Sequence, residues 1–228
     1  MPQGVDHRLI RAALVEDVDP PEPDGPASDA QERPASTRRK RMNGLPRQLD
    51  SLQTSYDRRV EETLANADLS QEYKAQLVAR LYDEARKKAQ KLIDAERDRL
   101  EAELRAARRA VFEPDLGGTE DGAALRASYR ERLEHAKKLT SADEVGEALE
   151  EAELTGDDLM AKALLYRAFA LGDAESVGAY LASRPQEEAN YEAFMAISEE
   201  WNEFERYCAL FGSSRFREPS EYGVRLRT

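Results

Sequence analysis

Cysteine and histidine are almost absent from this sequence of 228 residues. Cys208 is the single cysteine, so no internal disulfide can form and no cysteine cluster is available for zinc or an iron–sulfur centre. The two histidines, His7 and His135, have no second ligand at metal-binding spacing. The sequence also has no glycine-rich phosphate loop and no nucleophile elbow. These absences predict a protein without catalytic residues, metal or cofactor, and therefore not an enzyme.

Long apolar runs and strand patterns are missing too. The longest apolar runs have only a few residues, whereas a membrane-spanning helix needs roughly 20. The first residues lack the basic start and apolar core of a secretory signal. We therefore expect no membrane contact and a cytoplasmic location. Because β-branched residues are few and Ala, Leu, Glu and Arg recur throughout, the expected fold class is all-α.

Residues 1–44 are rich in proline and polar side chains and predict a disordered arm. Apolar residues in 9–18 can line one face of a short helix, which is either a nascent helix or a docking peptide that folds on a partner. The basic run 38–41 is either a solvated linker or a weak contact for acidic molecules, because four charges neutralise few phosphates. We do not expect nucleic acid as a partner. Met42 follows this run, so translation starting there is the alternative to a start at Met1.

Residues 45–112 predict a long, coiled-coil-like helical hairpin. A first helix is expected over 46–65. A second begins after the N-cap Ser70 and continues to Phe112 without Gly or Pro, over about 42 residues or roughly 63 Å. Its narrow apolar stripe needs cover from the first helix or from a second copy, which predicts a homo-oligomer. The expected interface residues on this helix are Leu77, Leu81, Leu92, Leu100 and Leu104.

Residues 113–121 predict a hinge, 122–211 a small bundle of short stacked helices, and 212–228 an irregular tail. The first bundle helix is expected over 122–139. Ser141 and Glu144 fit a capping box. A pattern then repeats after 16 residues, with Gly at each helix end and Asp at the next N-cap. The matching positions are Leu149/Leu165, Ala152/Ala168, Gly156/Gly172 and Asp157/Asp173.

The last long helix is expected over 186–211 and carries an aromatic stripe. One interpretation packs this stripe on the short helices, with Trp201 at the centre of a folded module over 141–211. The other makes part of it an exposed docking face, because aromatic side chains anchor interfaces. The residues expected to pack against the stripe are Leu149, Leu154, Leu164, Leu165, Phe169 and Leu181. The expected interface residues are Trp201, Phe204 and Tyr207.

Negative charge is concentrated in the second half of the chain. The formal net charge is −12, and residues 113–228 carry 13 basic and 25 acidic side chains, so that half accounts for all of it. The natural partner of such a surface is a basic one, unless the charge serves solubility alone.

The layout resembles that of uncharacterised helical proteins from the structural gene modules of actinobacterial phages and prophages. The similarity covers most of 42–211 and is carried by 42–49, the Arg/Glu/Ala-rich helix 70–112, and the segments 148–157 and 177–185. The excess of Arg over Lys, 26 to 8, is typical of such high-GC hosts. The resemblance brings no catalytic residues.

The resemblance implies a part in virion assembly as a scaffold-like factor, a minor capsid component or a head–tail part. The implied partners are the chain itself and capsid, portal or other virion proteins, and the implied location includes the virion. The alternative function is a cellular helical adaptor or regulatory interaction module.

Overall fold

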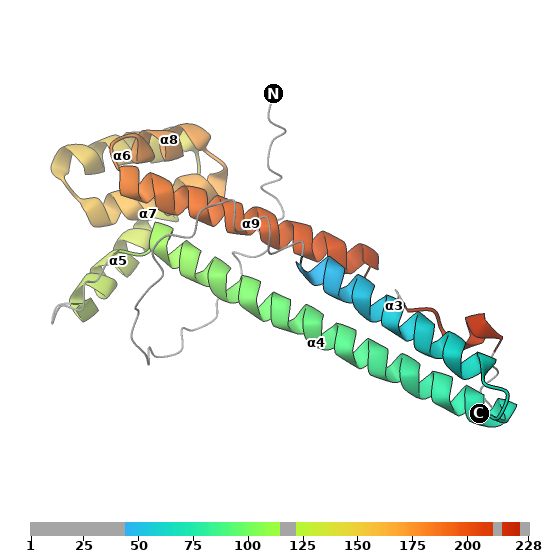
Figure 1. Cartoon of the computed structure of the whole chain (residues 1–228). Coiled ribbons are helices and arrows are strands. Elements are labelled where there is room, and N and C mark those ends of the chain that lie inside the picture. Colours follow the sequence, from blue (N-terminus) through green and yellow to red (C-terminus); the bar gives the residue numbers. More distant parts are fainter. Residues whose placement is uncertain (1–43, 115–121, 212–215, 224–228) are drawn as a thin grey trace. The chain divides into compact units, whose positions relative to one another are not determined.

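The computed structural model describes residues 44–114, 122–211 and 216–223 (Figure 1). Over these ranges the chain forms helices and no strand, which confirms the all-α fold class. All of the predicted arm except Gly44, which begins the first helix, lies outside the described residues, as do most of the predicted hinge and the two ends of the predicted tail. The helices are α3 (Gly44–Ala65), α4 (Gln71–Phe112), α5 (Gly122–Ala136), α6 (Ala142–Thr155), α7 (Asp158–Leu171), α8 (Ala174–Ala182), α9 (Pro185–Phe211) and the 3₁₀ helix η2 (Pro219–Tyr222).

One expected helix boundary is wrong. The helix predicted over 122–139 ends at Ala136. The amide groups of Lys138 and Leu139 bond to the carbonyl groups of His135 and Ala136, at 3.1 Å each. These bonds join residues three apart, so the chain leaves the α-helix through a tighter turn.

The chain divides into two compact units, and each is described by itself. Unit 1 contains the described residues of Glu103–Ser198, and unit 2 contains those of Gly25–Ala102 and Glu199–Thr228. The divisions fall inside α4 and α9, so each unit takes part of both long helices. The predicted segments 45–112 and 122–211 are bounded at helix ends, whereas these units divide within the two long helices.

Unit 1 has α7 at its centre. Helices α5, α6 and α8 each contact α7, and Leu164 and Leu165 on α7 are fully buried. Three aromatic rings from α4, α7 and α9 meet in its core. The ring centroid of Phe112 lies 5.3 Å from that of Phe169 and 5.4 Å from that of Phe194. The predicted packing of short helices against the start of the aromatic stripe therefore occurs around Phe194.

The 16-residue repeat builds two equivalent helix junctions in unit 1. Gly156 and Gly172 have φ of 68° and 78°, a left-handed conformation that glycine adopts without steric cost. The amide groups of Asp157 and Asp173 bond to the carbonyls of Ala152 and Ala168, at 2.9 Å in both copies. Each aspartate then caps the next helix. The capping box at the start of α6 is also present.

Two expectations about unit 1 are wrong. Leu154 was expected to pack on the aromatic stripe, but its side chain is 87% exposed, because it lies on the face of α6 opposite the buried Val145 and Leu149. Trp201 was expected at the centre of the module over 141–211, but it belongs to unit 2, where its ring lies 5.9 Å from that of Phe204.

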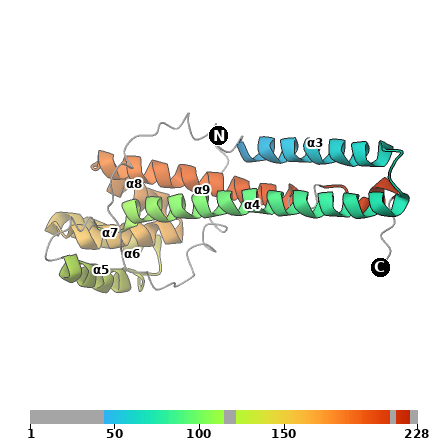
Figure 2. The ribbon, with the colours of Figure 1, turned by 60° about the horizontal axis from the view of Figure 1, so that its bottom comes forward.

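Unit 2 contains the helical hairpin of α3 and the first part of α4, which lie side by side in Figures 1 and 2. The rings of Tyr56 and Tyr82 are 6.4 Å apart, and the Lys74 ammonium group donates to the carbonyl of Leu64 at 2.7 Å. These contacts pair late residues of α3 with early residues of α4, so the two helices are antiparallel. The buried seam of α4 is made of small and branched side chains, and its members are Val78, Leu81, Ala85, Ala89 and Ile93.

Residues 216–223 pack on α3. The Tyr56 ring contacts Phe216 edge-on at 5.7 Å and Tyr222 at 6.3 Å. The Tyr222 hydroxyl donates to the Asp57 carboxylate at 2.7 Å, and the Tyr56 hydroxyl donates to the carbonyl of Arg217 at 2.9 Å. Part of the tail predicted as irregular is thus the short helix η2, held by aromatic contacts.

Candidate interaction site

The residues predicted to form an interface fall into two classes. Leu81 and Leu100 of α4 and Phe204 of α9 are buried within the chain itself. The others are half-buried, and they are Leu77, Leu92, Leu104, Trp201 and Tyr207. Leu104 packs on the core of unit 1, and the rest belong to unit 2. The structure does not bring these residues together on one surface.

Phe204 is held by contacts inside unit 2. The Arg97 guanidinium lies over its ring at 5.7 Å and also pairs with Glu205 at 3.7 Å. One turn earlier in α9, the Glu200 carboxylate accepts a hydrogen bond from Arg99 at 2.9 Å. These pairs join α4 to α9. Phe204, which was predicted to contact a partner, therefore stabilises the fold of the chain itself.

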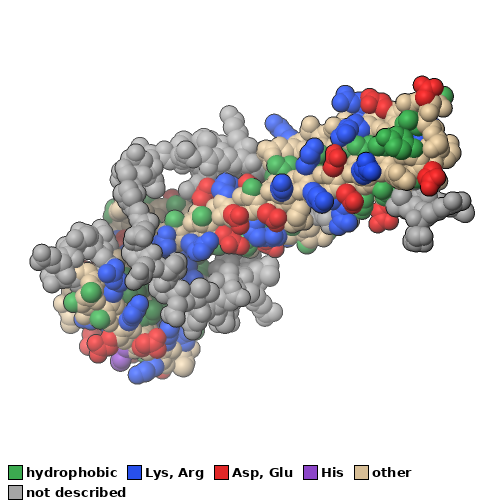
Figure 3. Space-filling view, turned by 90° about the horizontal axis from the view of Figure 1, so that it is seen from below, with side chains coloured by type: hydrophobic (Ala, Val, Ile, Leu, Met, Phe, Trp, Pro, Cys, Tyr) green, Lys and Arg blue, Asp and Glu red, His purple; other side chains and the backbone are tan. Residues whose placement is uncertain are grey.

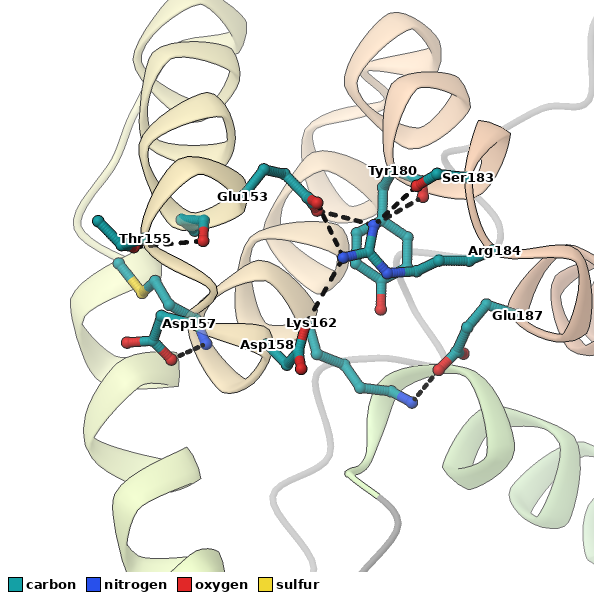
Figure 4. Close-up of polar contacts among 11 residues, drawn as sticks. Glu153, Thr155, Asp157, Asp158, Lys162, Tyr180, Ser183, Arg184 and Glu187 are labelled. Atoms are coloured by element: carbon teal, nitrogen blue, oxygen red, sulfur yellow. Dashed lines mark hydrogen bonds and ion pairs between the residues drawn. The ribbon is translucent and has the colours of Figure 1, made fainter.

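A polar cluster gathers at the α8–α9 junction of unit 1 (Figure 4). The Arg184 guanidinium stacks on the Tyr180 ring at 4.3 Å and pairs with Glu153 at 2.7 Å and Asp158 at 3.7 Å. Hydrogen bonding to Glu153 raises the pKa of Arg184. One side chain therefore connects α6, α7 and α8 at the start of α9.

The other part of this cluster is an ion pair between α7 and α9. The buried Lys162 ammonium group lies 2.8 Å from the Glu187 carboxylate. Burial raises the pKa of Tyr180, and the neighbouring Glu187 charge raises it further. The Tyr180 phenol thus stays protonated at neutral pH and is not an activated base. The cluster is suited to fixing helix ends rather than to proton transfer.

The outer face of α6 carries carboxylates and one leucine. Between residues 141 and 161 the sequence has eight acidic side chains and no lysine or arginine. Asp143, Glu147 and Glu150 are exposed and, with Leu154, follow one another at helical spacings of three and four on the same face. The opposite face of α6 carries the buried Val145 and Leu149. From the sequence, these carboxylates were interpreted as an ordinary solvated helix face. Their helical spacing nevertheless puts Leu154 on the same outer face, away from the core.

The outer face of α4 in unit 2 carries more basic than acidic side chains. Residues 80–91 contain five basic and two acidic side chains, and Arg80, Lys87 and Lys91 are exposed on the side away from the buried seam. Tyr73 lies seven residues before Arg80 on the same face and is 47% exposed. Figure 3 shows basic and acidic side chains interspersed on the view from below.

The Cys208 thiol, possible metal ligands and possible membrane-spanning helices are the remaining features that bear on function. Cys208 of α9 is half-buried, and burial raises the pKa of its thiol, which disfavours the reactive thiolate. Within 44–114, 122–211 and 216–223, no three His, Cys, Asp or Glu side chains are grouped as a metal site would require. In the same part of the chain, none of the helices combines the length and apolarity that crossing a membrane takes.

Comparison of this chain with protein families, curated proteins and solved structures finds no match.

Proposed function

We propose that this chain is a non-enzymatic structural protein of an actinobacterial phage, used in particle assembly, and that it works through helical protein–protein contacts. Its partners in this proposal are further copies of itself and a capsid, portal or other virion protein. It acts in the host cytoplasm until it joins the particle, as a scaffold-like factor, a minor capsid component or a head–tail part.

The observation that carries the protein-contact part of the proposal is the exposed face of α6. A leucine side chain that is 87% exposed leaves apolar surface in water, and burying one stabilises a complex by about 1.5–3 kcal/mol before ordering costs. Asp143, Glu147 and Glu150 precede it on the same face of α6, and their charge favours a basic partner surface. The assignment to phage assembly rests on the sequence resemblance over 42–211.

A gene-disruption experiment tests the proposal. The gene is inactivated in the phage or prophage that carries it, and particles from mutant and parent are separated on density gradients and counted by infection. We expect fewer infectious particles and incomplete or aberrant ones in electron micrographs, with recovery when the gene is supplied in trans. Normal particles at normal titre in the mutant would contradict the proposal.

Mass spectrometry of the parent particles then separates the assembly roles. A component of the mature particle is expected to be recovered at a constant ratio to the capsid protein, whereas a scaffold-like factor is expected only in precursor particles. Recovery in neither fraction, together with a normal titre after disruption, is the result expected of a cellular adaptor.

A further inference from the structure

Two exposed helix faces of this chain are complementary in charge and in length. On α6, the distance from Asp143 to Leu154 is 11 residues, or roughly 16 Å along the helix. On α4, Arg80 to Lys91 is also 11 residues, or roughly 16 Å. The first face is acidic and ends at the exposed Leu154, and the second has more basic than acidic side chains, with the exposed Tyr73 seven residues before its start.

We propose that the occupant of the acidic α6 face is the basic α4 face of a second copy of this chain. This inference rests on the proposed function, because it names one of the partners of the assembly protein. The two faces belong to different units, so the contact is heterologous, and repeating it links copies head to tail into a ring or an open chain.

An antiparallel arrangement of the two helices satisfies most of the charges. It places Asp143 opposite Lys91, and Glu147 opposite Lys87 and Lys88. The same register places Glu150 opposite Glu84, whose carboxylate pairs with Arg59, and Leu154 opposite Arg80, three residues from the half-buried Leu77.

The acidic side chains near the basic face do not cancel this complementarity. The Glu84 carboxylate lies 3.7 Å from the Arg59 guanidinium of α3, so its charge is offset within unit 2. Asp83 is the other acid among residues 80–91, and Asp94 and Asp98 lie beyond the end of the segment that faces α6. On the α6 side, Arg184 pairs with Glu153 and Asp158, and Arg132 pairs with Asp157. These three acids lie off the face formed by Asp143, Glu147 and Glu150.

Charge reversal with mixing tests the proposal on the full chain. One variant carries Glu147→Lys and Glu150→Lys on α6, and the other carries Lys87→Glu and Lys91→Glu on α4. Matched controls change the net charge equally at exposed positions off both faces, with Glu188→Lys and Glu192→Lys in one and Arg126→Glu and Arg130→Glu in the other. Circular dichroism checks that every variant is folded, and sedimentation velocity measures association at tens of micromolar.

The wild-type chain and both controls are expected to associate, and to do so more weakly as salt rises from ~0.05 to ~0.5 M, because exposed charges are screened. Each reversed variant alone is expected to weaken association at least tenfold. An equal mixture of the two reversed variants is expected to associate again, because the reversed faces now complement each other. This rescue distinguishes the contact from a loss of folding.

Several results would overturn the inference. They are a monomeric wild-type chain at all salt concentrations, association of the reversed variants equal to that of the wild type, equal losses in the controls, and a mixture that fails to associate. Because the gene-disruption experiment does not depend on self-association, a monomeric chain whose loss still abolishes particles would refute this inference and the self-association in the proposed function. It would leave the role in particle assembly through other virion proteins standing.

Discussion

At the residue scale, Phe204 and Trp201 of α9 differ in burial although they are one turn apart. The Phe204 side chain is 1% exposed and contacts Arg97, whereas the Trp201 ring is half-buried. Replacing a fully buried Phe with Ala costs about 3–5 kcal/mol. We therefore expect Phe204→Ala to lower the free energy of unfolding by about that amount and Trp201→Ala by clearly less.

Urea unfolding followed by circular dichroism measures both variants, and Leu154→Ala serves as the control. Because the Leu154 side chain is 87% exposed, its truncation should change the free energy of unfolding by less than about 0.5 kcal/mol. A larger loss of unfolding free energy for Trp201→Ala than for Phe204→Ala would show that Trp201, and not Phe204, is the more deeply buried side chain.

The phenol of Tyr56 makes unit 2 sensitive to alkali. Burial raises the pKa of Tyr56 from its usual 10.0 to about 12, with a further contribution from the Asp57 charge. A raised pKa means that the fold favours the protonated phenol. The stabilisation is complete below pH 10 and is lost as the pH rises through about 12.

Tyrosinate absorbance of the wild type, compared with that of Tyr56→Phe, measures this pKa. The difference should show one phenol titrating near pH 12, accompanied by loss of helix signal from the wild type in the same range. A difference titrating near the ordinary pKa of 10 would contradict the contact between Tyr56 and the end of the chain.

At the scale of elements, the two Gly–Asp junctions fix where the short helices of unit 1 turn. Gly156 has φ of 68°, and forcing an L-residue into this conformation costs about 1–2 kcal/mol. Gly178 lies inside α8 with ordinary helical φ and open space around its Cα. We expect Gly156→Ala to destabilise by about 1 kcal/mol and Gly178→Ala to stabilise by about 0.5–1 kcal/mol.

Thermal unfolding of the two variants gives the sign of each change. They carry the same substitution in neighbouring elements, so helix propensity alone predicts a gain for both. A gain for Gly156→Ala would mean that this residue is not left-handed in solution. A loss for Gly178→Ala would mean that a contact occupies the space beside it.

Helix ends that depend on residues a few positions apart could be predicted from the sequence. Ser141 and Glu144 bond to each other's backbone within one turn, and the Gly156–Asp157 junction depends on residues a few positions away. Which face of each short helix is buried was harder to predict from the sequence. Leu154 was read as core because it is apolar, although its spacing from Glu147 and Glu150 placed it on the outer face of α6.

At the scale of the whole molecule, the two units depend on pairings between α4 and α9, which are about a hundred residues apart. Arg99 contacts Glu200 in unit 2, and Phe112 contacts Phe194 in unit 1. The local sequence of either helix does not identify the helix that it packs against, because many helices have similar apolar stripes. The sequence therefore predicted a separate hairpin and bundle, and the aromatic stripe of α9 was assigned to one module instead of being shared between two.

The central claim is that this chain acts by contacting protein, and first of all another copy of itself, through the α6 and α4 faces. Zero-length coupling of carboxylates to lysines, in an equal mixture of ¹⁴N- and ¹⁵N-labelled full-length chains, tests it most directly. We expect mixed-isotope peptides that join Glu147 or Glu150 of one copy to Lys87, Lys88 or Lys91 of another. Only single-isotope crosslinks, or mixed ones that avoid both faces, would contradict it.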